Sequence, residues 1–176
     1  MTAKKNILLF ISLMLAVVAS AQSSTISVCG IPMGAEKKEA EKILEDRFGS
    51  LNVREDSGNL TVYNGYIGGV YHKFMTFFFA WINGKPIFNG AVFLTAFELN
   101  EKSKAIEHRE LIKSIYEKKY RLSEYINNDG FKSYEFWDKE GYIGFITIIK
   151  SESNDGKFRL YAKVQYDGIY DETDDI

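Results

Sequence analysis

A single cysteine, two histidines and two prolines are all that the 176 residues contain of these residue types. One cysteine, Cys29, excludes an internal disulfide, so the hydrophobic core alone must hold the fold together. Neither paired cysteines nor the HExxH pattern is present, which excludes the common signatures of zinc sites. The Gly-x-Ser-x-Gly elbow of serine hydrolases is absent as well. We therefore expect no catalytic residues, no metal site and no cofactor, and hence a protein that is not an enzyme.

An excess of positive charge is also missing, because 22 Lys and Arg stand against 24 Asp and Glu, for a formal charge of −2. Nucleic-acid binding requires a basic surface, so we expect no nucleic-acid partner. Long apolar runs are missing beyond the N-terminus, where Phe77–Ile82 is the most apolar stretch. A bilayer span needs about 20 apolar residues, so we expect no membrane span after the N-terminal segment has been removed.

The N-terminus does carry one apolar run, Ile7–Val18, which follows Lys4 and Lys5 and precedes the small residues Ala19-Ser20-Ala21. A positive start, a short apolar run and a small-x-small site are typical of a secretory signal peptide. The sequence therefore predicts a signal peptide over residues 1–21 and a periplasmic or secreted protein. An uncleaved membrane anchor is the alternative, but the run is short for a span.

Aromatic residues are abundant, at 15% of the chain, so a sizeable core can form. Apolar residues at helical spacing predict helices over 35–48 and 103–120. Asn83-Gly84 is a strong hairpin signal, and Asn154-Asp155-Gly156 marks a second tight turn. β-Branched and aromatic runs predict strands at 60–63, 70–82, 87–99, 131–137, 142–150 and 158–166.

Similar stretches recur in the two halves: Gly65-Tyr66-Ile67-Gly68 resembles 141–144, Asn83-Gly84-Lys85 resembles 155–157, and Ile43-Leu44 resembles 115–116. Matches in the same order favour an internal duplication. We predict an α+β fold, a tandem duplication of a helix plus an antiparallel three- to four-stranded unit. The predicted parts are a signal peptide (1–21), a first repeat (22–100), a second repeat (101–167) and an acidic tail (168–176).

The run GIPMGAEKKEAEKILEDRFG and the segment ELIKSIYEKKY resemble the helices of small exported bacterial proteins of uncharacterised function. A tandem of such units is similar to the β-lactamase-inhibitor-protein-like fold. The resemblance implies one curved antiparallel sheet with helices on one face and the other face open for binding. Arg121 departs from the pattern, because a glycine usually follows the second helix. No catalytic residues come with the resemblance, and fold alone does not imply inhibition.

The last strand alternates cleanly, with Phe158, Leu160, Ala162 and Val164 expected to face the helices. The strand at 70–82 is apolar on both faces: Val70, Phe74, Phe78 and Ala80 should share one, and Tyr71, Met75, Phe77, Phe79 and Trp81 the other. Something should cover the second set, either the N-terminal segment with Cys29 and Ile31, or a partner, a second copy or a ligand. The candidate binding residues on the open face are Tyr71, Lys73, Phe77, Phe79, Trp81, Tyr161 and Lys163.

The two histidines lie on apolar faces, His72 in phase with Val70 and His108 on the second helix, and lone histidines in such places usually belong to the core. Cys29 reads as a small buried hydrophobe, with a reactive thiol as the alternative.

The leading hypothesis is an exported, non-catalytic binding module that uses the open face to bind an exported protein, a glycan or a second copy of itself. The alternatives are an inhibitor or accessory protein of an exported enzyme, and a small hydrolase with a site around His72 or His108.

Overall fold

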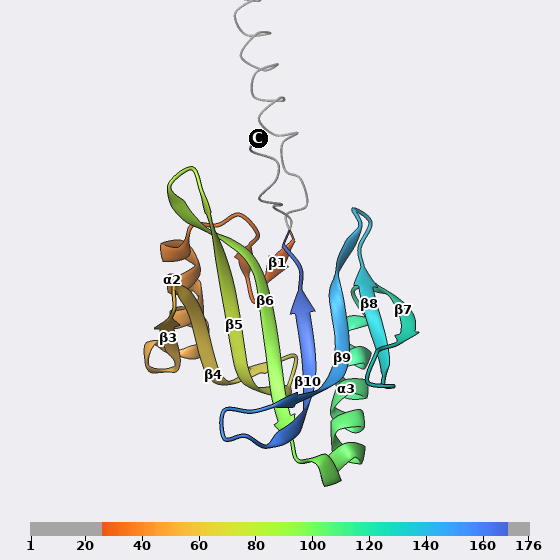
Figure 1. Ribbon diagram of the computed structural model, residues 1–176. Helices are drawn as coiled ribbons and strands as arrows, with labels where there is room; N and C mark the ends of the chain where they lie inside the picture. Colours follow the sequence, from red (N-terminus) through yellow and green to blue (C-terminus); the bar gives the residue numbers. More distant parts are fainter. Residues whose placement is uncertain (1–25, 169–176) are drawn as a thin grey trace, which may run out of the picture.

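The computed structural model describes residues 26–168, so the predicted signal peptide and all but the first residue of the predicted acidic tail lie outside it. The chain is α+β, with two α-helices, an eight-stranded antiparallel sheet and a two-stranded sheet among the described residues (Figure 1). The strands are β1 (Ser27–Val28), β2 (Ile31–Pro32), β3 (Val53–Asp56), β4 (Asn59–Ile67), β5 (Val70–Ile82), β6 (Lys85–Phe97), β7 (Arg121–Ile126), β8 (Lys132–Trp137), β9 (Tyr142–Glu152) and β10 (Phe158–Tyr166). The helices are α2 (Lys37–Phe48) and α3 (Lys102–Tyr116), with short 3₁₀ turns η1 (Ser50–Asn52) and η2 (Leu99–Glu101).

The large sheet runs in the order β3-β4-β5-β6-β10-β9-β8-β7. Strands β3 to β6 follow each other along the chain on one side, and β7 to β10 do the same on the other side. The two groups meet where β6 pairs with β10, from Leu160 opposite Phe97 to Tyr166 opposite Ala91. The last strand of each group is therefore central, and the first is an edge.

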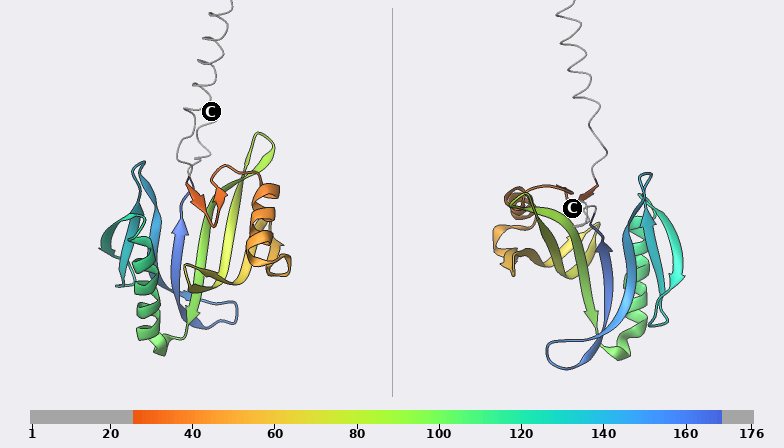
Figure 2. Two further views of the ribbon diagram at one scale, coloured as in Figure 1. Left: turned by 180° about the vertical axis from the view of Figure 1, so that it is seen from behind. Right: turned by 45° about the horizontal axis from the view of Figure 1, so that its top comes forward.

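Both helices lie on the same side of the large sheet, α2 behind the β3–β6 group and α3 behind the β7–β10 group (Figure 2). The core between them is continuous, because Leu44 of α2 and Ile112 of α3 belong to one buried cluster with Phe77, Phe93 and Phe136. We call the opposite side of the large sheet the open face, because neither helix covers it.

Each helix is shorter than its periodicity predicts. The first begins at Lys37 rather than residue 35, because the backbone of Gly34 and Ala35 pairs with that of Phe88 at 2.9 and 2.8 Å. The second ends at Tyr116, after which the Tyr120 N–H still bonds the Tyr116 carbonyl at 2.8 Å in a turn. Tertiary and turn hydrogen bonds thus set these ends.

The predicted hairpin at Asn83-Gly84 is confirmed. Both residues have positive φ, 51° and 74°, and Ile82 pairs with Lys85 across the turn. Two positive φ values are what a tight two-residue turn needs to match strand twist. The alternation of the last strand is also confirmed from Leu160 onward, while Phe158 at its start is exposed.

Two strands escaped prediction, β3 and β7, because their sequences VRED and RLSEYI are rich in charge. They are the edges of the sheet, where charged side chains protect unpaired backbone from association.

One sequence match was misleading: residues 65–67 end β4, whereas Gly141 lies before β9 begins. The two stretches therefore occupy different strands of the two groups, unlike the turns at 83–84 and 155–156.

Candidate binding site on the open face

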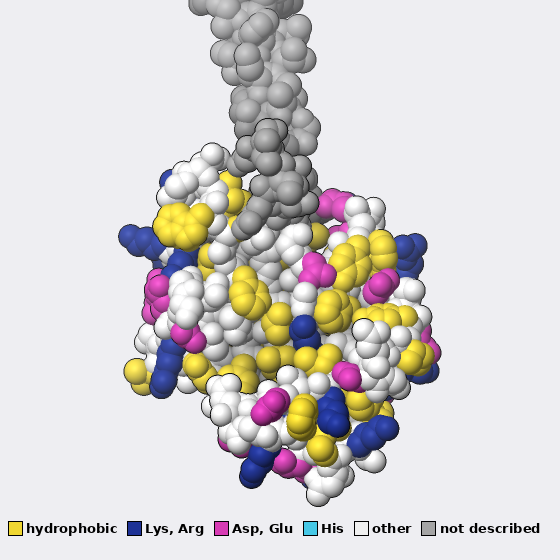
Figure 3. Space-filling model, in the orientation of Figure 1, with side chains coloured by type: hydrophobic (Ala, Val, Ile, Leu, Met, Phe, Trp, Pro, Cys, Tyr) yellow, Lys and Arg dark blue, Asp and Glu magenta, His cyan; other side chains and the backbone are white. Residues whose placement is uncertain are grey.

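Side chains on the open face form rows that cross the sheet from strand to strand. In one row Phe74 of β5 stands opposite Leu94 of β6, which stands opposite Lys163 of β10. In the next, Ala96 stands opposite Tyr161, and Tyr161 opposite Ile149 of β9. Neighbouring strands lie about 4.8 Å apart, so each row is a closely packed strip. Figure 3 shows hydrophobic side chains across the middle of this face, with charged groups around them.

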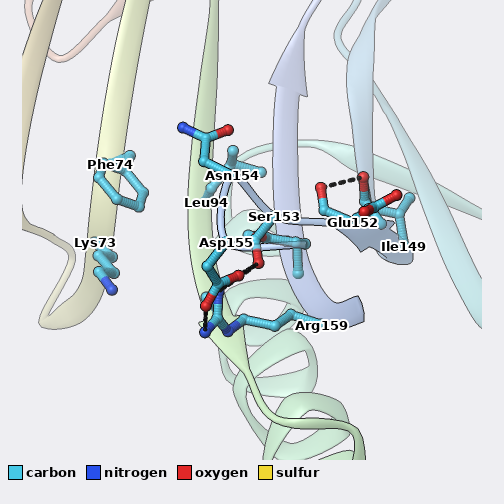
Figure 4. A pocket seen from close by; sticks show the side chains of 12 residues that line it. Lys73, Phe74, Leu94, Ile149, Glu152, Ser153, Asn154, Asp155 and Arg159 are labelled. Carbon is cyan, nitrogen blue, oxygen red and sulfur yellow. Dashed lines mark hydrogen bonds and ion pairs between the residues drawn. The ribbon is translucent and has the colours of Figure 1, made fainter. Parts of the chain in front are cut away.

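The β9–β10 loop folds across one end of the open face and borders a partly open cavity of about 510 Å³, which we call the loop cavity. Its floor is apolar and its loop side is polar (Figure 4). Strands β5, β6, β9 and β10 contribute Lys73, Phe74, Leu94, Ala96, Ile149 and Tyr161, and the loop and its flanks contribute Ser151, Glu152, Ser153, Asn154, Asp155 and Arg159.

Arg159 fixes the loop that forms the cavity wall. Its guanidinium pairs with Asp155 at 2.7 Å and with Glu98 at 3.1 Å, and it also donates to the Ser153 hydroxyl. The hydrogen bonds from Arg159 and Ser153 hold the pKa of Asp155 well below its usual range, so this carboxylate is charged at any ordinary pH. Since Glu98 lies at the end of β6, the contact ties the loop to a strand distant in sequence.

Two lysines lie on the open face with their ammonium groups over aromatic rings. The Lys73 Nζ lies 5.5 Å from the ring centre of Phe74, and the Lys163 Nζ lies 5.1 Å from that of Phe145. Such contacts stabilise a cation modestly. Burial lowers the pKa of Lys163, and nearby Asp167 acts in the opposite direction.

Of the predicted binding residues, Lys73 and Tyr161 line the loop cavity, and Lys163 lies beside it opposite Leu94. Tyr71 lies outside it, where its hydroxyl donates to Asn64 at 2.6 Å. Trp81 lies near the tip of the β5–β6 hairpin and is 76% exposed.

The prediction that Phe77 and Phe79 share the open face is wrong. Phe77 is fully buried on the helix side, and Phe79 packs there against Phe88 at 5.9 Å between ring centres. Their cover comes from within the chain, because Val28 and Ile31 of the N-terminal segment belong to the same core cluster. No partner is needed to bury this set.

Two irregularities explain the error. His72 and Met75 are both buried on the helix side, while Lys73 and Phe74 between them both line the loop cavity, so the alternation of β5 shifts by one residue. The facing strand accommodates the shift at Asn64, whose φ is 56°. The second irregularity falls between Phe78 and Phe79, where the register with β6 changes.

The residues that sequence reasoning missed are Phe74, Leu94, Ile149 and the β9–β10 loop. Phe74 was assigned to the same face as Val70, which is buried on the helix side. Alternation within the return strand could have revealed Leu94, since Phe93 and Thr95 beside it are both buried. Nothing local signals that the loop folds over the sheet.

The two histidines meet on the helix side, with ring centres 6.1 Å apart. His72 is 2% exposed, and its Nδ1, like the Nε2 of His108, is buried without a hydrogen-bond partner among the described residues. Burial, and then the neighbouring His108, lower the pKa of His72 to about 4. Burial also lowers the pKa of His108, and a hydrogen bond to the Tyr71 backbone opposes this.

Cys29 packs against the core, where burial raises its thiol pKa to about 12, so the small-hydrophobe interpretation fits better than a reactive thiol.

Among residues 26–168, no cluster of three or more His, Cys, Asp or Glu side chains is arranged to hold a metal ion. In the same part of the chain, no helix is both long and apolar enough to cross a membrane.

Comparison with known proteins adds no assignment: no protein-family model, curated protein or solved structure matches this chain.

Proposed function

We propose that this protein is an exported, non-catalytic binding module that binds a partner protein through the open face. The observation that carries the proposal is the loop cavity, an apolar hollow of about 510 Å³ on a sheet face that neither helix covers. Ligand sites are concave and mostly apolar, with a few polar groups placed around them. The bonds of Arg159 to the loop form the wall in advance, which reduces the ordering cost of binding.

A protein suits this surface better than a small molecule, because the apolar area continues beyond the cavity. Phe78 on the same face is 39% exposed, and Val92 and Phe145 are half-buried. A small ligand would leave these side chains in water, whereas a protein surface could cover them together. Apolar centres with a polar rim are the usual anatomy of protein interfaces.

The proposal keeps the tandem arrangement expected from the sequence, with repeats over 22–100 and 101–167. What supports it is the order of elements, since a helix followed by four antiparallel strands occurs twice in the chain. The turns at 83–84 and 155–156 both join the third and fourth strands of their groups. The same arrangement supports the proposed likeness to the β-lactamase-inhibitor-protein-like fold.

An inhibitor or accessory protein of an exported enzyme would use the same open face, and it is one form of this proposal. A hydrolase built around the histidines has less support. His72 packs against Phe93 at 5.5 Å between ring centres and lies on the side away from the loop cavity. A substrate would have to displace a helix to reach it.

The test compares Leu94→Arg with Leu111→Arg. Leu94 lies on the cavity floor, whereas Leu111 is a 50% exposed residue of α3 and serves as the matched control. Each purified protein is immobilised and exposed to an extract of the organism that makes it, and light scattering reports its oligomeric state. We expect one protein to be retained by the wild type and the control and lost with Leu94→Arg, or a dimer that only Leu94→Arg dissociates. An identical retained set and the same mass for all three would contradict the proposal.

A further inference from the structure

Neither lysine of the open face, Lys73 or Lys163, is paired with an acidic side chain of residues 26–168. Their ammonium groups lie over the rings of Phe74 and Phe145. Asp167 favours the charged form of Lys163, but its carboxylate accepts hydrogen bonds from Tyr142 and Gln165. A cation on an apolar surface that a partner will cover needs an opposite charge from that partner, because burying it unpaired costs free energy.

The acidic groups beside the cavity are already engaged or point elsewhere. Asp155 is paired with Arg159. The Glu152 carboxylate turns back over the loop, since a Cβ placed on Gly156 would lie 3.7 Å from its Oε1. At the cavity floor, the charges that no ion pair among the described residues matches are therefore the two ammonium groups, which lie on β5 and β10 rather than on the loop.

The two cations flank the apolar floor. Leu94 stands directly opposite Phe74 on one side and directly opposite Lys163 on the other, and Lys73 precedes Phe74. An apolar group seated on Leu94 would therefore have the backbone of Lys163 one strand spacing away on the β10 side, with its ammonium group over Phe145, and the ammonium group of Lys73 near Phe74 on the β5 side.

We infer that the open face recognises a segment of a partner protein in which a large apolar side chain stands next to a carboxylate. The apolar side chain enters the loop cavity over Leu94, and the neighbouring carboxylate pairs with Lys73 or Lys163. This inference rests on the proposed function and specifies the chemistry of the partner. The burial that lowers the pKa of Lys163 acts in the same sense, since a bound carboxylate would restore favourable surroundings to that ammonium group.

The experiment titrates the ¹⁵N-labelled protein with two blocked tripeptides, Asp-Phe-Asp and Lys-Phe-Lys, followed by amide chemical shifts. We expect Asp-Phe-Asp to shift the amides of Leu94, Ile149 and Tyr161 and to bind about fivefold or more tightly than Lys-Phe-Lys, as partly exposed charge pairs allow. The preference should shrink in Lys73→Gln and in Lys163→Gln.

Lys150→Gln is the matched control. Its Nζ lies 5.3 Å from the ring centre of Phe158, a contact of the same kind, but Lys150 stands opposite the buried Leu160 rather than on the open face. The preference for the acidic peptide should be unchanged in this variant.

Equal binding of the two peptides, or tighter binding of Lys-Phe-Lys, would overturn the inference while leaving the proposed function intact. A preference that survives both lysine substitutions, or that Lys150→Gln also removes, would overturn the assignment to this site. If neither peptide shifts these amides at millimolar concentration, the inference fails as well. The Leu94→Arg comparison then decides separately whether the open face binds a partner.

Discussion

Acid should destabilise this protein through His72, and a substitution of that residue should remove the effect. The ring is 2% exposed and lies against His108 and Phe93. Its pKa falls from 6.5 to about 4 on folding, because burial and the neighbouring imidazole both disfavour the charged form. Between these values the unfolded chain binds a proton that the folded chain does not, so stability is lost as the pH falls from about 6.5 to about 4.

The size of the effect follows from the two pKa values. The loss reaches about 3 kcal/mol once His72 is protonated in both states, and roughly 2 to 3 kcal/mol of it is already present at about pH 4.5. The assay is urea unfolding of the wild type and His72→Phe at about pH 7.5 and about pH 4.5. Titration of the remaining groups largely cancels in the difference between the two proteins. We expect the wild type to lose roughly 2 to 3 kcal/mol more than the variant.

An equal loss in both proteins would refute the reasoning, because it would mean that His72 binds its proton as readily in the folded state as in the unfolded chain. A larger loss in the variant would point to a stabilising charge near the ring.

Three further predictions concern the burial of two phenylalanines, a hydrogen bond between two buried tyrosines, and the ion pairs of Arg159. Phe77→Ala should lower the free energy of unfolding by about 3–5 kcal/mol and Phe74→Ala by only about 1 kcal/mol, because only Phe77 is fully buried. Urea unfolding measures both, and similar losses in the two variants would contradict the assignment of these residues to opposite faces of β5. Tyr116→Phe and Tyr166→Phe should each cost about 1–2 kcal/mol and the double variant less than their sum, because the buried hydroxyls bond each other at 2.6 Å; additive losses in the double-mutant cycle would argue against that bond. Arg159→Met should speed amide hydrogen exchange in the 153–157 loop without changing global stability much; unchanged exchange would show that Arg159 does not hold the loop.

Features encoded locally could be predicted from the sequence. The Asn83-Gly84 turn, both helices and the long strands all depend on residues next to one another. The edge strands β3 and β7 could not be found this way, because backbone pairing with β4 and β8, rather than their own charged sequences, holds them in the sheet. The faces of β5 failed for a related reason, since alternation assumes an unbroken ladder.

The candidate site depends on contacts between distant residues, which is why only part of it was anticipated. A Cβ on Gly90 would lie 2.8 Å from the Tyr166 carbonyl, a close approach that no local pattern reveals. The wall of the loop cavity includes Arg159, which pairs with Asp155 in the loop and with Glu98, the residue that follows the neighbouring strand β6. Lys73, Tyr161 and Lys163 were anticipated because exposed basic and aromatic residues stand out even in a strand whose phase is misjudged.

The pairing of β6 with β10 also bears on how the chain reaches its native state. Every other ladder of the large sheet joins strands that are neighbours in sequence, so each group can form through short loops. The β6–β10 ladder alone, among the described strands, joins residues far apart along the chain, and its loop-closure entropy is correspondingly larger. The folding rate should therefore be set by the docking of two preassembled meanders, and destabilising this central ladder should slow folding more than destabilising either edge.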